Sequence, residues 1–270
     1  MMEAILLPTK RKFSWRVFLI VLVLTLVASL LKVPMVIANG YADQPGLWTS
    51  IILQVTLSNF VLFGLPGAIG LLLANQIGLG LPFIEGWVDK KPLKGKIGKI
   101  ALIALLAAAV LTVIGIGVRF LTLPMILAEF GARNIPLSAL GESTQGPWWT
   151  MLLAALSAGI TEEVGFRLGL LTILIWGIGW IWHDETGRAK PIGFWLANLL
   201  VAVLFGAIHL LNLSALGLPL MSGLLIRAIL GNGLLALAFG WLYRTYGLES
   251  AMLTHFFLDV LLYVILPLAV

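Results

Sequence analysis

Long apolar stretches without charge recur along the whole chain. Asp, Glu, Lys and Arg are absent from residues 17–31, 51–84, 100–118, 148–161, 168–182, 191–226 and 228–243. Several of these stretches approach or exceed the roughly 20 residues that an α-helix needs to cross a bilayer. Because polar positions do not alternate with apolar ones at a period of two, the pattern favours helices over a membrane barrel.

The pattern predicts an all-α, polytopic transmembrane bundle of about seven spans. They are expected at 15–38, 50–76, 98–127, 148–182, 191–210, 219–243 and 249–268. The fourth span would be about 52 Å long as one straight helix. It is therefore strongly tilted, extends beyond the membrane, or splits near Gly165 to Gly169, which would give eight spans. The connection from Gly131 to Pro147 is rich in Gly, Ser and Pro and divides 1–145, a set of transmembrane helices, from 146–270.

Composition excludes a water-soluble domain, because 60% of the residues are apolar and only 11% are charged, against about 25% in soluble domains. Basic residues gather before the first span and between the second and third, at Lys10, Arg11, Lys12, Arg16, Lys90, Lys91, Lys94, Lys96 and Lys99. The positive-inside rule explains this excess without a nucleic-acid partner and places the N-terminus in the cytoplasm. We expect an integral protein of a prokaryotic plasma membrane, surrounded by lipid.

Three charges lie inside the fourth expected span, at Glu162, Glu163 and Arg167. Each charged side chain at mid-membrane costs about 2.5–3.5 kcal/mol, so these three must face protein or water. Glu163 and Arg167 are four residues apart and can form an ion pair on one helix face. Glu162 points about 100° away and is left free, which favours a functional role for it over simple neutralisation of Arg167.

Two histidines also fall in apolar spans. His255 is followed one turn later by Asp259, so the two side chains share a helix face, whereas His209 has no partner in its own helix. The chain has no cysteine, so its chemistry must come from His, carboxylates or hydroxyls. A free carboxylate, two imidazoles and a second carboxylate can activate water and stabilise an oxyanion. HExxH, GxSxG and P-loop motifs are absent from the sequence.

The ordered trio EEVGFR, FGAIH and HFFLD resembles the EExxxR, FxxxH and HxxxN/D motifs of the CPBP family, the CAAX proteases and bacteriocin-processing (Abi) proteins. The resemblance covers about 148–268 and implies that 146–270 is a catalytic core. It implies an intramembrane endopeptidase in which Glu162 and His209 activate the hydrolytic water. His255 and Asp259 would complete the site, and Glu163 and Arg167 would be the supporting pair.

Two positions depart from the motifs of many members. Leu168 replaces a Gly, which affects close helix packing, and Asp259 replaces the Asn of the eukaryotic members. An ionised Asp cannot donate a hydrogen bond to an oxyanion, so Asp259 orients His255, binds a metal or stays protonated.

The sequence leaves the cofactor open between none and zinc. His209, His255 and one carboxylate would satisfy a catalytic zinc with an open position, as in a metalloprotease. The alternative, which we favour, is metal-independent chemistry based on the glutamate.

The sequence also leaves substrate and function class partly open. The substrate is a membrane-associated or lipidated peptide or small protein, prenylated or not, and the oligomeric state is not determined. Other readings are a non-catalytic bacteriocin-immunity or binding protein on the same scaffold, or a transporter or proton pathway. The lack of an inverted repeat argues against transport.

Straight, parallel spans would not bring the three motifs together. His255 lies about seven residues into its span, whereas Glu162 and His209 lie much deeper in theirs, a mismatch of ~16 Å. We therefore expect a broken or re-entrant element near the last motif. Either the turn from Tyr243 to Ser250 dips into the protein, or the helix breaks at Gly231-Asn232-Gly233.

Overall fold

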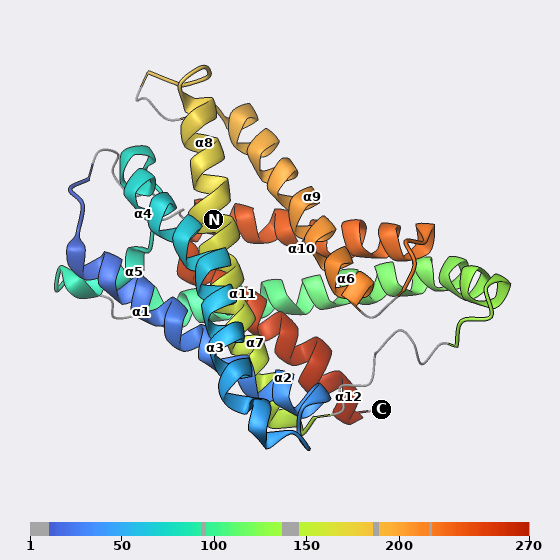
Figure 1. Ribbon diagram of the computed structural model, residues 1–270. Coiled ribbons are helices and arrows are strands. Elements are labelled where there is room, and N and C mark those ends of the chain that lie inside the picture. Colours follow the sequence, from blue (N-terminus) through green and yellow to red (C-terminus); the bar gives the residue numbers. More distant parts are fainter. Residues whose placement is uncertain (1–10, 93–95, 137–145, 186–188, 216–217, 270) are drawn as a thin grey trace.

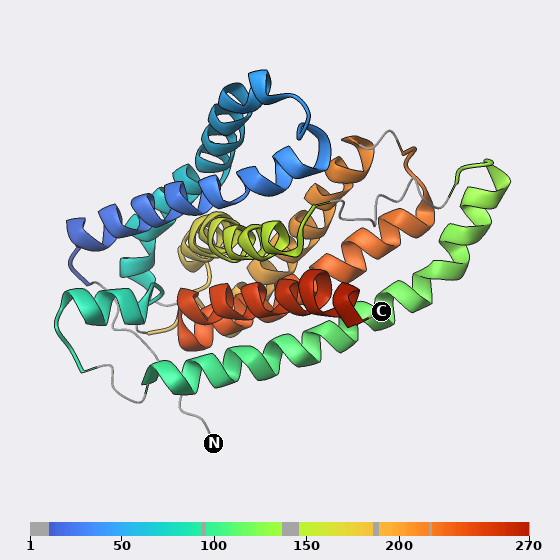
Figure 2. The same ribbon diagram turned by 90° about the horizontal axis from the view of Figure 1, so that it is seen from below.

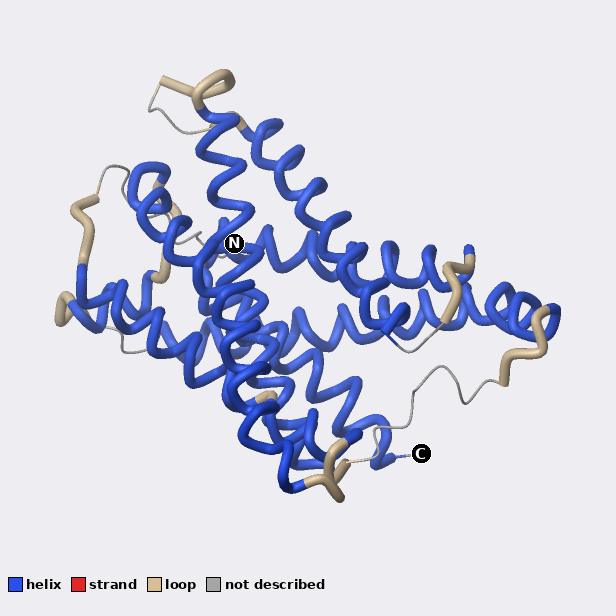
Figure 3. The backbone as a smooth tube through the Cα atoms, in the orientation of Figure 1, coloured by secondary structure: helices blue, strands red, loops and turns tan. Residues whose placement is uncertain are grey.

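The computed structural model describes residues 11–92, 96–136, 146–185, 189–215 and 218–269. Most of the expected boundary connection, together with Lys10 and Lys94, lies outside these residues. The described chain is helical apart from turns and one isolated bridge between His183 and Ala189 (Figures 1 and 3).

The first half contains α1 (Trp15–Leu31), α2 (Val33–Gly40), η1 (Pro45–Leu47), α3 (Trp48–Asn59), η2 (Phe60–Gly64), α4 (Leu65–Ile77), α5 (Pro82–Val88) and α6 (Lys96–Ala132). The second half contains α7 (Trp148–Glu163), η4 (Val164–Leu171), α8 (Thr172–Gly179), α9 (Pro191–Ala215), α10 (Ser222–Tyr246), α11 (Leu248–Val260), η5 (Leu261–Ile265) and α12 (Leu266–Ala269). The segments η2, η4 and η5 are π-helical.

Six helical stretches in the described part of the chain are long and apolar enough to span a membrane. They are Trp15–Gly40, Pro45–Ile77, Ile97–Ala132, Pro191–Leu211, Ser222–Tyr246 and Leu248–Leu268. These match six of the expected spans, and the all-α polytopic bundle is confirmed. The remaining expected span, 148–182, is helical from Trp148 to Gly179 and carries Glu162, Glu163 and Arg167 in its middle.

The segments α7, η4 and α8 form one continuous helical column, so the split near Gly165 to Gly169, one of the three alternatives for this span, does not occur. In its place the helix widens into the eight-residue π segment η4. At its end the Thr172 hydroxyl donates to the Arg167 carbonyl at 3.0 Å and bonds the Tyr243 hydroxyl at 2.8 Å. Figure 2 shows α7 between α1 and α11, which both contact it. The column is thus the centre of the bundle, and π segments of this kind occur often at functional sites.

Helix α4 packs against η4 through close backbone contact. A Cβ atom at Gly70 would overlap the carbonyl oxygen of Leu168 and approach Gly169 Cα at 2.8 Å. Leu168 is fully buried in this contact. Close approach of the two helices requires a small residue, and here that residue is Gly70 on α4.

Of the two alternatives near the last motif, the turn between Tyr243 and Ser250 is present at Gly247, and the residues on both sides of it are buried. Gly247 has φ of +93°, which favours glycine, and it joins α10 directly to α11. The alternative break at Gly231-Asn232-Gly233 is wrong, because α10 is continuous from Ser222 to Tyr246. Figure 1 shows α6 and α10 running across the direction of α8. The helices are therefore not parallel spans, and the ~16 Å mismatch in depth expected for parallel spans does not apply.

Replacing Gly70 by Ala should lower the thermal stability of the detergent-solubilised protein, because the added methyl overlaps a helical carbonyl that cannot turn away. The expected loss is about 1–3 kcal/mol, the usual cost of overpacking, measured by tryptophan fluorescence during heating. Gly117→Ala is the matched control, because a Cβ at Gly117 meets nothing within 4 Å. Equal transition temperatures for the two variants would contradict the close contact between α4 and η4.

Candidate active site

A buried ion pair joins the end of α7 to the first turn of η4. Arg167 Nη1 donates to Glu163 Oε1 at 3.0 Å, and both side chains are completely buried. The pair expected from the four-residue spacing is confirmed. The guanidinium also donates from Nη2 to the Ala236 carbonyl on α10, at 3.3 Å, so the pair ties the column to a second helix.

The same carboxylate oxygen also binds His255 on α11. His255 Nδ1 lies 2.8 Å from Glu163 Oε1. An ionised carboxylate only accepts hydrogen bonds, so Nδ1 carries the proton and donates it. His255 Nε2 lies 3.6 Å from Asp259 Oδ2, which is too long for a hydrogen bond but close enough for electrostatic attraction. Glu163, and not Asp259, therefore makes the hydrogen bond that orients His255.

Aromatic rings surround the buried guanidinium. Arg167 Cζ lies 4.6 Å from the ring centroid of Phe205 and 5.1 Å from that of Phe239, within range of cation–π attraction. Phe239 also stacks on the His255 ring, with centroids 4.8 Å apart and planes inclined by 15°. Phe205 belongs to the FGAIH motif, whereas Phe239 is one apolar residue in an apolar helix and gives no signal in the sequence.

His209 reaches this cluster through Phe205. Its Nδ1 donates to the Phe205 carbonyl at 2.7 Å, one turn earlier on α9, which leaves Nε2 as an acceptor. The Phe205 ring contacts both imidazoles, with centroid distances of 4.8 Å to His209 and 6.2 Å to His255. The two histidines thus flank a shared aromatic ring without a direct hydrogen bond to each other among the described contacts.

Glu162 lies beside the cluster and is half-buried. Within the described chain it makes no hydrogen bond or ion pair, as its direction on the helix predicted. Its charge is close enough to act on Arg167, His255 and Asp259. Direct contacts therefore join Glu163, Arg167, His255 and Asp259, while Glu162 is the free carboxylate next to them.

Residues 144–261 match the family model described as type II CAAX prenyl endopeptidase Rce1-like. The match spans all three motifs, EEVGFR, FGAIH and HFFLD. This part of the chain matches the CPBP family. The match supports, in general terms, an intramembrane endopeptidase. No curated protein and no solved structure matches the chain.

In the part of the chain that the structure describes, no group of three or more His, Asp or Glu side chains is arranged to hold a metal ion. Both histidines use Nδ1 for hydrogen bonds, to Phe205 and to Glu163. These donors do not form the three-ligand set that a catalytic zinc needs, and no step below is assigned to a metal.

An apolar cavity of about 400 Å³ adjoins the CPBP motifs. Gly159 and Ile160 of α7 line it one turn before the Glu pair, and Met252 and Phe256 of α11 line it beside His255. Leu24, Phe83, Ile84, Ile97, Ile100, Leu156, Glu249 and Leu253 complete its wall. The cavity is therefore next to the charged cluster but is not lined by it.

Replacing Arg167 by Met should destabilise the protein by about 3–5 kcal/mol, the usual cost of leaving a buried charge without its partner. Thermal unfolding in detergent measures the loss. The double variant Glu163→Gln, Arg167→Met removes both charges and should regain part of the stability. An Arg167→Met protein as stable as wild type would mean that Glu163 is not held as a buried anion.

Proposed function

We propose that the protein hydrolyses a peptide bond of a membrane-associated or lipidated peptide or protein, with Glu162 and His209 activating the water. The observation that carries the proposal is the buried Glu163 carboxylate, which holds His255 at 2.8 Å beside an unpaired Glu162. An oriented imidazole next to a free carboxylate is what general acid–base hydrolysis requires.

In the proposed reaction the water oxygen attacks the scissile carbonyl carbon while Glu162 takes a proton from the water. His209 Nε2 accepts a hydrogen bond from that water and aligns it. The proton held by Glu162 then passes to the leaving amine, so the carbon–nitrogen bond breaks and the carboxylate is restored.

His255 completes the site by stabilising the oxyanion. Its ring is held through Nδ1 by Glu163, and the negative charge of Asp259 near Nε2 favours a proton there. A protonated Nε2 donates to the oxyanion, which an ionised Asp259 cannot do. Arg167 keeps Glu163 ionised by pairing, so the supporting pair acts on the reaction through His255.

The apolar cavity beside the motifs supports a lipidated substrate. Its volume of about 400 Å³ lies in the range of small-ligand sites, and its apolar lining suits a hydrocarbon chain. A chain bound there would present the attached peptide to α7 and α11. We further propose the cytoplasmic membrane of a prokaryote as its location, with the basic N-terminal segment on the cytoplasmic side.

Purified wild type should cleave a quenched fluorescent farnesylated C-a-a-X peptide, and Glu162→Gln and His209→Ala should lower kcat/KM by about 10²–10⁴-fold, the usual contribution of a general base. Glu185→Gln, at an exposed loop position, is the matched control and should keep wild-type activity. The same peptide without the farnesyl group tests the lipid requirement. Cleavage that survives Glu162→Gln would rule out the proposed base, whereas binding without cleavage would favour the non-catalytic alternative.

Metal analysis of the same purified samples separates the two hydrolytic mechanisms. We expect less than equimolar zinc and unchanged cleavage after chelation. Stoichiometric zinc that is lost in His255→Ala would replace the glutamate mechanism with that of a metalloprotease.

A further inference from the structure

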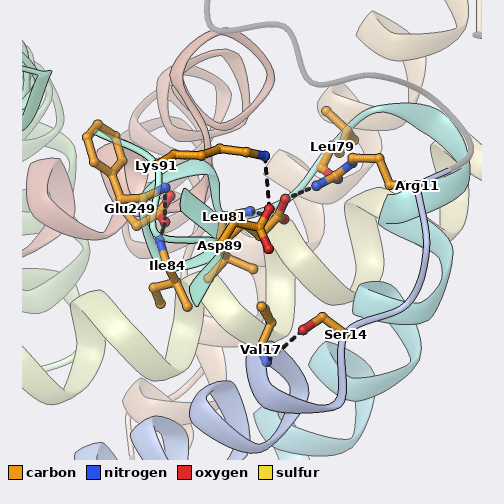
Figure 4. A network of polar contacts seen from close by, with 11 residues as sticks. Arg11, Ser14, Val17, Leu79, Leu81, Ile84, Asp89, Lys91 and Glu249 are labelled. Atoms are coloured by element: carbon orange, nitrogen blue, oxygen red, sulfur yellow. Dashed lines mark hydrogen bonds and ion pairs between the residues drawn. The ribbon is translucent and has the colours of Figure 1, made fainter. Parts of the chain in front are cut away.

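The first turn of α11, the helix that carries His255 and Asp259, is held by Glu249. Its Oε1 accepts hydrogen bonds from the backbone N–H groups of Phe83 at 2.9 Å and Ile84 at 3.0 Å. Figure 4 shows the carboxylate directed at the start of α5. These N–H groups have no partner within their own helix, so a carboxylate there satisfies two donors at once.

Two backbone features next to Glu249 reinforce the contact. The Leu248 N–H donates to the Gly80 carbonyl at 3.0 Å. A side chain at Gly247 would overlap the ring of Pro82. The chain from Gly80 to Ile84 therefore lies directly against the first turn of α11 and fixes where that helix begins.

This supporting segment is itself fixed by Arg11 and Glu85. The two side chains form an ion pair, and Arg11 also donates to the Leu79 carbonyl. Glu85 Oε1 accepts from the Leu81 N–H at 3.0 Å. Both side chains are only 16% exposed, so this ion pair, drawn in Figure 4, belongs to the packed interior and not to the surface.

Position along the axis of α11 matters because its contacts with α7 are close. A Cβ at Gly159 would approach Met252 O at 2.9 Å and Phe256 N at 3.1 Å. One turn further on, His255 meets Glu163 at 2.8 Å. A slide of α11 by 1 Å would stretch that hydrogen bond beyond its normal range.

We infer that Glu249 is a positioning residue that sets the depth of α11 and so holds His255 against Glu163. The inference rests on the proposed function for its effect on hydrolysis, but not for its effect on His255 geometry. Glu249 also borders the apolar cavity, but its Oε1 is bonded to the start of α5. It lies about 9 Å along the helix from His255, so it acts on the imidazole through the helix.

Glu249→Ala should lower kcat for the farnesylated peptide about tenfold or more, with KM within about twofold, since small misplacements of reacting groups cost up to about 10²-fold. Glu249→Gln keeps an oxygen acceptor and should restore kcat to within about twofold of wild type. The matched control is Glu129→Ala. Glu129 accepts from Ser222 N at 3.1 Å and Gly223 N at 3.0 Å at the start of α10, so it is an equivalent contact at another helix. The control should lose similar thermal stability and keep kcat.

A second measurement does not depend on activity. The chain has three histidines, so the ring signals of ¹⁵N-histidine-labelled protein can be assigned, with His255→Gln identifying the His255 signal. Glu249→Ala should move the His255 Nδ1 resonance, and Glu129→Ala should not.

The outcomes separate the inference from the proposed function. An unchanged His255 resonance in Glu249→Ala overturns the inference, whatever the activity. A moved resonance in a protein whose wild type cleaves none of the peptides supports the inference and counts against the proposed function. Should Glu249→Ala fail to fold, Glu249→Asp withdraws the acceptor by one methylene and is compared in the same way.

Discussion

The arrangement of the second half depends on one buried carboxylate. Glu163 Oε1 accepts from Arg167 Nη1 and from His255 Nδ1, and the side chain is fully buried. Removing a carboxylate from water costs several kcal/mol, which one neutral contact cannot offset. Two donors to Oε1, one of them a permanent cation, offset part of that cost, while Oε2 has no hydrogen-bond partner among the described residues. Both contacts require that η4 and α11 approach α7 at this point.

The neighbouring core residues pack around these two contacts of Glu163. The π segment η4 changes the direction of side chains after Glu163, and Arg167 at its start reaches both the carboxylate and Ala236 O of α10. Phe205 and Phe239 cover the remaining faces of the guanidinium. Because each ring also contacts His255, the packing that shields the cation also fixes the imidazole. The ion pair and the aromatic packing therefore share residues, so a shift of one would disturb the other.

The sequence predicts those features that follow from spacing along one helix. Charge-free stretches predicted the membrane helices, and the interval between Glu163 and Arg167 predicted their pair. The bond from Glu163 to His255 joins residues 92 positions apart, and nothing in either helix specifies it. Phe239 gives no signal because its role arises only from its neighbours. The expected break at Gly231-Asn232-Gly233 is absent for a physical reason. A Cβ atom added to Gly233 would lie 3.3 Å from Ala202 O on α9. Gly233 thus permits close packing of α10 on α9 instead of breaking α10.

The family match begins at residue 144, yet the contacts that set the site cross that boundary. Within a bilayer, apolar side chains gain nothing by leaving lipid for one another, so helix positions are specified by close-packed small residues and satisfied polar groups. Gly70 provides the first kind of contact for η4, and the start of α5 provides the second for α11. The motif residues are therefore necessary but not sufficient for the geometry. The first half of the chain carries none of the motifs. Its contacts nevertheless hold η4 and α11 at matching depths in the bundle.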